Sequence, residues 1–314
     1  MKIFFDPRRN SGKIDPRWFP IFKDKLEDHH LFLPDDGYNA SEIDALIAFR
    51  LYENPVEAYP NLKCILSLAA GVNHFLRSDH FPDDIMLVRM IDQGIIQGMR
   101  EYILSMILRH HIRHDYFNSA QEEGNWAWEE GAFSLAQNRR VGFLGSGELA
   151  KACALDAVHL GFHVMTWSRG PKHIEGVSSY HGDDALDEML VESDILVGLL
   201  PLTDQTRGLM TADKLAKLPE GAAIINAGRG PVFVDEDLIK MLDNGHLSCA
   251  YLDVFSREPL PKDHPFWTHP KIHITPHISA LTRPETAVEH IQDVLEHLEK
   301  GLAPPGLVDV NRGY

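Results

Sequence analysis

The stretch Val141-Gly142-Phe143-Leu144-Gly145-Ser146-Gly147-Glu148-Leu149-Ala150 decides the fold. An apolar run leads into a Gly-x-Gly-x-x-Ala turn, and a helical pattern begins directly after it. In this context Gly145 permits a tight turn, Gly147 lets the backbone approach a pyrophosphate, and Ala150 allows the helix to pack closely on the strand. The N-terminus of such a helix offers N–H groups and a positive dipole end. The stretch therefore predicts a dinucleotide site, and a glycine-rich turn without a ligand is the alternative.

The pattern around this turn is an alternation of strands and helices. Strands are predicted at 141–144, 162–167, 195–200, 223–226, 249–252 and 272–275, with helices at 148–160, 185–191, 211–217 and 235–244. This is the order of a doubly wound parallel sheet. The first third carries similar apolar runs at 3–5, 45–49, 64–68 and 86–90, with a helical segment at 18–27. The fold class is therefore α/β, with two Rossmann-like or flavodoxin-like domains that contain parallel sheets.

Three segments connect these two regions. A helix is predicted over 94–116, crossing between the domains. The connection 117–138 is unusually long, which indicates a functional segment or part of an interface. A last helix over 284–300 begins with Pro284, ends before Gly301, and is expected to return the chain to the first domain.

Composition excludes several classes of protein. The chain has 314 residues, enough for two domains, and a formal net charge of -16 that argues against a nucleic-acid surface. Cys64, Cys153 and Cys249 lie in apolar runs and are expected to be buried thiols of a reducing compartment. No stretch is long enough to span a bilayer, and the protein is expected in the cytoplasm without a membrane partner.

The residues that end the predicted strand 162–167 indicate which dinucleotide the protein binds. An NAD enzyme usually places an acidic residue there, whereas this chain has Ser168 and Arg169. A guanidinium can bind a 2′-phosphate through charge-assisted hydrogen bonds, and Lys172 is near in sequence. NADPH is therefore preferred over NADH, although an arginine that merely closes the strand is the alternative.

Three polar segments follow later strands of the same series, at 226–230, 252–260 and 275–279. They bring Arg229, Glu258 and His277 to the sheet edge where open α/β sheets bind ligands. A guanidinium binds and polarises an oxyanion without losing its proton, and an imidazole titrates near neutrality and can act as general acid or base. The three residues are predicted to lie around one crevice.

Together with the run Leu199-Leu200-Pro201-Leu202-Thr203, these motifs resemble the D-isomer-specific 2-hydroxyacid dehydrogenases, in matching order over nearly the whole chain. The stretch 274–284, Val308-Asp309 and the ending Arg312-Gly313-Tyr314 are most similar to the bacterial glyoxylate/hydroxypyruvate reductase A branch. The resemblance implies a cofactor domain at 95–284 inserted into a substrate domain formed by 1–94 and 285–314. It also implies reduction of a small 2-keto acid, glyoxylate or hydroxypyruvate, to the 2-hydroxy acid.

The resemblance also assigns roles to individual residues. Arg229 would pair with the substrate carboxylate and keto oxygen, His277 would protonate that oxygen, and Glu258 would hydrogen-bond His277. Gly71 and Val72 would hold the substrate carboxylate through backbone N–H groups. The expected cofactor contacts are Gly145, Ser146, Gly147, Glu148, Leu149, Ser168, Arg169, Leu200, Pro201, Thr206, Ala227, Gly228 and Asp253.

Two further features have a functional and a structural interpretation. Trp126, in a Gly-Asn-Trp-Ala-Trp segment, could cross a homodimer interface formed by the cofactor domain and contact the partner's substrate, or could simply pack in that interface. His110 and His114 are spaced one helical turn apart, but lack a third ligand, so a solvated helix face is favoured and no metal is predicted.

Three other functions are compatible with parts of the sequence. An NAD-dependent dehydrogenase for larger D-2-hydroxy acids would share every motif. A cofactor-sensing protein, similar to a corepressor, would keep the fold and could lack turnover. A methyl transferase could use a glycine-rich first turn, but would have no need for Arg229, Glu258 and His277.

Overall fold

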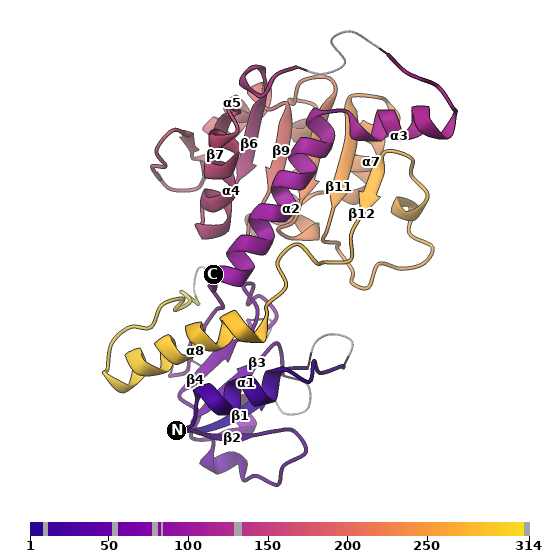
Figure 1. Cartoon of the computed structure of the whole chain (residues 1–314). Coiled ribbons are helices and arrows are strands. Elements are labelled where there is room, and N and C mark those ends of the chain that lie inside the picture. The colour runs from indigo at the N-terminus through magenta and orange to yellow at the C-terminus, as the bar shows by residue number, and fades with distance from the viewer. Residues whose placement is uncertain (9–11, 52–55, 77–80, 83, 129–133, 311–314) are drawn as a thin grey trace. The chain divides into compact units, whose positions relative to one another are not determined.

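The computed structural model describes residues 1–8, 12–51, 56–76, 81–82, 84–128 and 134–310 (Figure 1). The ending Arg312-Gly313-Tyr314 lies outside the described residues. The chain forms two compact units: unit 1 comprises Met1–Ile95 and Leu281–Tyr314, and unit 2 comprises Ile96–Ala280. Unit 2 is therefore inserted into unit 1 in the sequence. Among the described residues no helix is both long and apolar enough to cross a membrane.

Unit 1 is built on a five-stranded sheet in the order β2-β1-β3-β4-β5. The strands are β1 (Lys2–Asp6), β2 (His30–Phe32), β3 (Ala45–Ala48), β4 (Cys64–Ser67) and β5 (Met86–Val88), and all neighbours pair in parallel. The central strands β3 and β4 are buried along their whole length, as expected for a sheet covered on both faces. Strand β2 was not predicted, because its three residues are only partly buried at the sheet edge.

Helices α1 (Trp18–Lys25) and α8 (Pro284–Glu299) pack together in unit 1. Arg17 Nη1 donates to Glu285 Oε1 at 2.7 Å, which joins the N-terminal ends of the two helices. Helix α8 has proline in its first turn and is followed by Gly301, whose φ of 67° allows the chain to leave the helix. Helix α8 therefore belongs to unit 1.

Unit 2 contains a seven-stranded sheet in the order β12-β11-β10-β9-β6-β7-β8. Its strands are β6 (Arg140–Leu144), β7 (His163–Ser168), β8 (Ser178–His181), β9 (Ile195–Gly198), β10 (Ala222–Asn226), β11 (Leu247–Leu252) and β12 (Ile272–Ile274), all paired in parallel. The chain runs outward in both directions from the β6–β9 pair. This is the doubly wound arrangement, with its switch point between β6 and β9.

Alternate residues of the unit 2 strands face opposite sides of the sheet. Val141 and Phe143 of β6 belong to a buried cluster with α2 (Gln93–His111) and α4 (Glu148–His159). Leu144 faces the other cluster, which includes α5 (Asp183–Glu192), α6 (Ala212–Leu215) and α7 (Asp235–Asp243). Each such side chain contributes about 1.5–3 kcal/mol when fully buried. The remaining short helices are 3-10 turns at Ala40–Glu42, Val56–Ala58, Ala136–Asn138, Gly230–Val232 and Pro265–Trp267.

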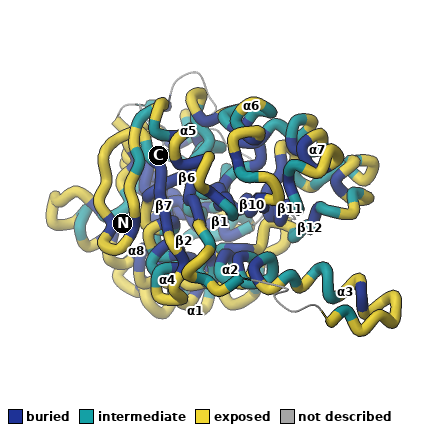
Figure 2. The backbone as a smooth tube through the Cα atoms, turned by 90° about the horizontal axis from the view of Figure 1, so that it is seen from above, coloured by how far each residue is buried: buried dark blue, intermediate teal, exposed yellow. Residues whose placement is uncertain are grey.

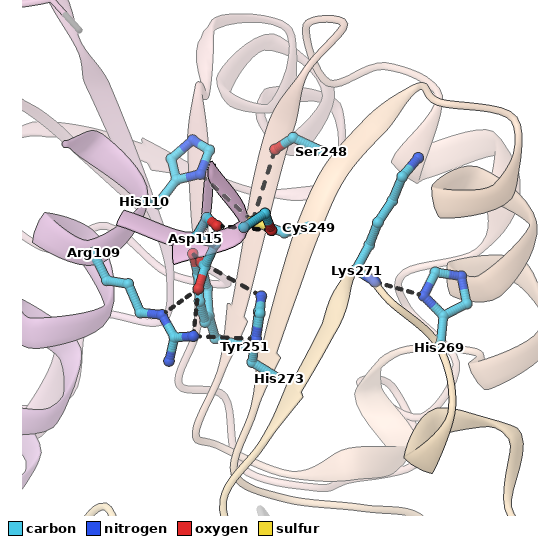
Figure 3. A network of polar contacts seen from close by, with 10 residues as sticks. Arg109, His110, Asp115, Ser248, Cys249, Tyr251, His269, Lys271 and His273 are labelled. Carbon is cyan, nitrogen blue, oxygen red and sulfur yellow. Dashed lines mark hydrogen bonds and ion pairs between the residues drawn. The ribbon is translucent and has the colours of Figure 1, made fainter. Parts of the chain in front are cut away.

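The helix predicted over 94–116 is wrong at its C-terminal end. Helix α2 stops at His111, and α3 (His114–Glu122) follows after Arg113, whose φ of 57° is left-handed and breaks the helix. A polar network holds this corner against the sheet, with Arg109 and Asp115 at its centre (Figure 3). Asp115 accepts a hydrogen bond from Tyr251 Oη at 2.5 Å, so the sheet favours the broken path of the chain.

Helix α3 projects from the body of unit 2, and much of its surface is exposed (Figures 1 and 2). It takes up the start of the connection predicted as irregular over 117–138; residues 129–133 of that connection lie outside the described residues. Trp126 and Trp128, which follow α3, have exposed fractions of 84% and 79%. Two large exposed indoles mark this segment as a candidate contact surface.

Candidate functional site

The turn after β6 has the geometry that the glycine pattern predicts. Gly145 adopts a φ of 117°, a value that favours glycine, and its N–H donates to Trp167 O at 2.8 Å. Gly147 is the N-cap of α4 and has no side chain to cap the helix; a Cβ placed there would meet no atom within 4 Å. Ala150 is buried. The helix N-terminus therefore faces open space, as an approach by a pyrophosphate requires.

The opposite side of this turn is formed by the residues after β9. A Cβ on Gly145 would lie 3.2 Å from Leu199 O, so the two loops at the switch point are close together. Leu200 and Thr206 are buried, and Thr206 Oγ1 donates to Pro201 O at 2.7 Å and accepts from Thr203 N at 2.8 Å. Thr206 thus shapes the loop that carries Leu200 and Pro201.

The end of β7 has no acidic side chain. Ser168 Oγ donates to Gly170 O at 2.9 Å, and the exposed Arg169 extends its Nη1 to Gln205 Oε1 at 2.5 Å. Gln205 was missed in the sequence, because 36 residues separate it from Arg169 and no local pattern connects them. Because Gln205 is neutral, it orients the Arg169 guanidinium without cancelling its charge. A positive charge at this strand end is compatible with binding a phosphate group.

The loop after β10 is fixed by close backbone packing. Asn226 Nδ2 donates to Arg229 O at 3.2 Å, and Asn226 Oδ1 accepts from Gly228 N at 3.3 Å. A Cβ at Gly230 would lie 2.0 Å from Phe255 C, so only glycine fits against the next loop. Ala227 and Gly228 are both buried. Asn226 was not predicted as a site residue, yet it shapes the loop that carries Arg229.

Arg229 itself is partly buried, and its Nη1 donates to Gly228 O at 2.7 Å. Burial lowers the pKa of Arg229, and the nearby Glu258 carboxylate opposes that effect. A guanidinium nevertheless stays protonated in proteins. The site therefore holds one permanent positive charge at the carboxyl end of β10.

Glu258 and His277 form a direct pair. His277 Nδ1 lies 2.7 Å from Glu258 Oε2, and Glu258 Oε1 accepts from Phe255 N at 3.0 Å. Burial alone would raise the pKa of Glu258, but the His277 hydrogen bond, the Phe255 N–H and the Arg229 charge lower it overall. An ionised Glu258 accepts the Nδ1 proton, which leaves Nε2 of the half-exposed His277 ring as the atom available to a ligand.

Asp253 lies beneath the loop that carries His277. It is fully buried, and its carboxylate accepts hydrogen bonds from Thr275 Oγ1 at 2.6 Å, Ile278 N at 2.9 Å and Ser279 N at 2.9 Å. These contacts lie within the protein. Its expected contact with the cofactor stays a prediction.

The predicted substrate residues Gly71 and Val72 belong to unit 1. They follow β4 in a turn where Ser67 Oγ both donates to Ala69 O and accepts from Ala69 N, each at 3.0 Å. Val72 is buried, and Thr282 Oγ1 donates to Leu68 O at 2.6 Å. The turn is therefore held firmly at the carboxyl edge of the unit 1 sheet.

The interpretation of His110 as part of a solvated face is wrong. His110 is partly buried at the end of α2, with its Nε2 atom buried and its Nδ1 3.5 Å from Cys249 Sγ (Figure 3). His114 begins the separate helix α3. Burial lowers the pKa of His110 to about 4. Within the described ranges, no three His, Cys, Asp or Glu side chains are grouped as metal ligands would be.

The three cysteine environments are not identical. Cys64 and Cys153 are buried, and burial raises the pKa of each thiol to about 12. Cys249, expected to be buried, is partly exposed and lies beside His110 and Ser248. All three are free thiols.

Comparisons with known proteins agree with this geometry. Residues 104–279 match the family model of the D-isomer specific 2-hydroxyacid dehydrogenase, NAD binding domain. The glyoxylate/hydroxypyruvate reductase A of Serratia proteamaculans is 40% identical over 258 residues, which cover 81% of this chain and 82% of the relative. The Yersinia enterocolitica reductase of the same name is 38% identical, with the same coverage.

Solved structures extend the similarity to the whole chain. A D-isomer specific 2-hydroxyacid dehydrogenase from Xanthobacter autotrophicus Py2, in complex with NADPH and MES, has a TM-score of 0.92 and 36% identity, covering 100% of this chain and 99% of its own. The NADPH-dependent glyoxylate/hydroxypyruvate reductase of Sinorhizobium meliloti, in complex with NADP and sulfate, has a TM-score of 0.89 and 31% identity, with the same coverage. The chain belongs to the D-isomer-specific 2-hydroxyacid dehydrogenase family.

Proposed function

We propose that this protein reduces a small 2-keto acid, glyoxylate or hydroxypyruvate, to the corresponding 2-hydroxy acid with NADPH. The observation that carries the proposal is the Glu258–His277 pair, 2.7 Å apart, at the same sheet edge as Arg229. The relatives named glyoxylate/hydroxypyruvate reductase support this choice of substrate. The larger D-2-hydroxy acids are the alternative substrates.

The residues of unit 2 fit a dinucleotide phosphate. The uncapped N-terminus of α4 faces open space at Gly147, and the left-handed Gly145 keeps the turn tight. We propose contacts to the cofactor from Gly145 through Leu149, and from Leu200, Pro201, Thr206, Ala227, Gly228 and Asp253. Ser168 and Arg169 would hold the 2′-phosphate, which is supported by relatives solved with NADPH or NADP. When bound, NADPH supplies a hydride to the keto carbon.

His277 would supply the proton that balances this hydride. Glu258 fixes Nδ1 of the ring, so the proton on Nε2 is directed outward to the keto oxygen. That oxygen becomes the hydroxyl group as the C=O double bond becomes a single bond. In the reverse direction the neutral ring would accept the same proton. Such general acid–base catalysis contributes typically about 10²–10⁴-fold.

Arg229 would bind the substrate carboxylate and polarise the keto oxygen. Its charge is permanent, and Asn226 and the close contact of Gly230 with Phe255 hold its loop. Charge-assisted hydrogen bonds from a planar guanidinium suit an oxyanion. Gly71 and Val72 stay proposed contacts of the same carboxylate, supported by their turn after the carboxyl end of β4.

We further propose that the protein is a homodimer formed through unit 2, with Trp126 contacting substrate in the partner's site. The projecting helix α3 and the exposed indoles of Trp126 and Trp128 support an interface there. The free thiols of Cys64, Cys153 and Cys249 favour a reducing compartment, the cytoplasm. Small 2-keto acids are the proposed partners of the site, rather than nucleic acid or membrane.

The test is the oxidation of NADPH and NADH by the purified protein with glyoxylate, hydroxypyruvate and pyruvate. His277→Ala is measured in parallel, together with NADPH binding by fluorescence. Turnover that prefers NADPH with glyoxylate or hydroxypyruvate is expected, and His277→Ala should lose at least about a hundredfold in kcat while still binding NADPH.

Other results would favour a different cofactor, substrate or function. A preference for NADH would contradict the proposed role of Arg169 but would leave the proposed reduction of the keto acid unaffected. Turnover of only larger keto acids would favour the alternative substrates. NADPH binding without turnover of any keto acid would contradict the reductase and favour a cofactor-sensing role.

A further inference from the structure

The loop that carries His277 has an unfavourable backbone conformation. His277 has a φ of 56°, in the left-handed region that residues other than glycine rarely adopt. Such a conformation persists only where its surroundings hold it in place. Its own N–H donates to Thr275 O at 3.0 Å, which closes the turn but does not join it to the sheet.

Asp253 provides that anchor. Its buried carboxylate accepts the N–H groups of Ile278 and Ser279, the two residues that follow His277. It also accepts from Thr275 Oγ1, two residues before His277. One carboxylate at the end of β11 therefore holds the loop on both sides of the imidazole.

Thr275 links Asp253 to helix α2. Thr275 Oγ1 lies 2.6 Å from Asp253 Oδ1 and 2.8 Å from Tyr102 Oη. Thr275 donates its single hydroxyl proton to Asp253 Oδ1, so towards Tyr102 it can only accept. Tyr102 must then donate to Thr275. Burial raises the pKa of Tyr102 to about 12, so the phenol keeps its proton at neutral pH.

The hydroxyl groups thus form a one-way relay, in which Tyr102 donates to Thr275 and Thr275 donates to Asp253. Successive hydrogen bonds of this kind polarise one another, so the loss of the first weakens the next. Tyr102 lies on α2 beside Ile103, a fully buried residue that packs on the sheet. The phenol therefore reaches the loop from a fixed position.

We propose that Tyr102 is a positioning residue for the reaction: through Thr275 and Asp253 its hydroxyl holds the loop in the conformation that presents His277. The effect on catalysis rests on the proposed function, whereas the effect on the loop does not. Tyr102 is expected to act on kcat, because it orients the proton donor and touches neither substrate nor cofactor.

The chain offers a matched control for removing the phenol. Tyr251 is a buried tyrosine and Tyr102 a partly buried one, and the hydroxyl of Tyr251 also joins the sheet to the α2–α3 region, through Asp115 (Figure 3). Its hydroxyl does not contact Thr275 or Asp253 in the part of the chain that the structure describes. Tyr251→Phe should therefore reproduce the loss of stability of Tyr102→Phe without disturbing the His277 loop.

The experiment compares Tyr102→Phe, Thr275→Val, Thr275→Ser and Tyr251→Phe with the wild-type protein. It measures kcat and KM for NADPH and the keto acid, the isotope effect with 4-deuterated NADPH, and amide hydrogen exchange of the peptide spanning 276–280. Tyr102→Phe should lower kcat about tenfold, the equivalent of one hydrogen bond, with little change in KM and with a larger isotope effect. Thr275→Val should lower kcat by a similar factor. Thr275→Ser, which keeps the hydroxyl, should retain most of the wild-type kcat.

Exchange of the amides of residues 277–280 tests the relay without any turnover. It should be faster in Tyr102→Phe and Thr275→Val than in wild type, and unchanged in Tyr251→Phe. Unchanged exchange in Tyr102→Phe would overturn the relay, as would equal losses of kcat in Tyr102→Phe and Tyr251→Phe. A wild-type protein that lacks turnover but shows the expected exchange would instead contradict the proposed function and leave the relay supported.

Discussion

Glu258 Oε2 lies 2.7 Å from His277 Nδ1, and the other oxygen of the same carboxylate accepts Phe255 N. The backbone thus fixes the carboxylate, and the carboxylate fixes the ring. Of the two partners Glu258 is the more buried, with an exposed side-chain fraction of 25% against 47% for His277. Ligands can reach the imidazole while its orienting partner stays protected.

Glu258→Gln should lower kcat by about ten- to hundredfold, because the neutral amide no longer stabilises the charged form of the ring. The pKa of Glu258 lies below its usual value, so its carboxylate is ionised above the ordinary carboxylate range and becomes protonated only as pH falls through that lowered pKa. Wild-type activity should therefore not decline from protonation of Glu258 at pH 5. Rate measurements from pH 4 to 9 test this, and a wild-type kcat in Glu258→Gln would contradict the pair's role.

Arg229→Gln should raise KM for the keto acid and lower kcat together. The lost charge-assisted hydrogen bonds are worth about 2–3 kcal/mol, or about 30- to 150-fold in kcat/KM. Arg229→Lys keeps the charge but not the planar fork, and should recover only part of the loss. Steady-state kinetics with a separate measurement of NADPH binding tests the assignment. A large loss of NADPH affinity with an unchanged KM for keto acid would place Arg229 on the cofactor instead.

Arg169→Ala should weaken NADPH use selectively. Loss of the guanidinium that faces the 2′-phosphate should lower kcat/KM for NADPH about ten- to hundredfold and leave NADH nearly unchanged. Gln205→Ala is the companion variant, because Gln205 holds Arg169 Nη1 at 2.5 Å. It should give a smaller loss in the same direction. Equal losses with both cofactors would indicate that Arg169 only closes the strand.

Trp126 can be tested by mixing two inactive or impaired proteins. If Trp126 contacts substrate in the partner's site, Trp126→Ala should raise KM for keto acid while ultracentrifugation still shows a dimer. A dimer with one Trp126→Ala subunit and one His277→Ala subunit then contains one intact site, and coexpression should restore activity. Trp128→Ala, with a similar exposed fraction, is the matched control. No recovery in the mixed dimer would favour simple interface packing or action within one subunit.

The sequence predicts the arrangement of strands and helices in this protein better than it predicts the hydrogen bonds between polar side chains. The glycine-rich turn and the alternation of apolar strands with helices predict the doubly wound sheet. The edge strand β8 was not predicted, because it is mostly exposed and has no apolar run. The corner at Arg113 depends on Asp115 meeting Tyr251, two residues 136 positions apart. Gln205 and Tyr102 were not predicted for the same reason, since each acts through a partner that is distant in sequence. Asn226 was also not predicted, although its partners Gly228 and Arg229 lie in its own loop. The left-handed His277 likewise needs the anchored loop.

Acid stability should depend on His110. Burial is the largest effect on its pKa, Arg139 and His111 lower the value further, Asp115 raises it, and the result is about 4. The unfolded chain titrates near about 6.5, so between these values the unfolded state binds a proton that the folded state does not. The free energy of unfolding should therefore fall as pH drops from about 6.5 towards 4, by up to roughly 3 kcal/mol from His110 alone.

His110→Asn tests this dependence. Asparagine keeps a polar group near Cys249 Sγ, where His110 Nδ1 lies at 3.5 Å, but it does not titrate. Urea unfolding at several pH values should show a shallower decline for the variant below pH 6.5, and parallel curves above it. His159→Asn is the control, because it removes a histidine at the end of α4 that is not buried. Identical slopes for wild type and His110→Asn would show that this histidine is as easily protonated in the folded protein as in the unfolded chain.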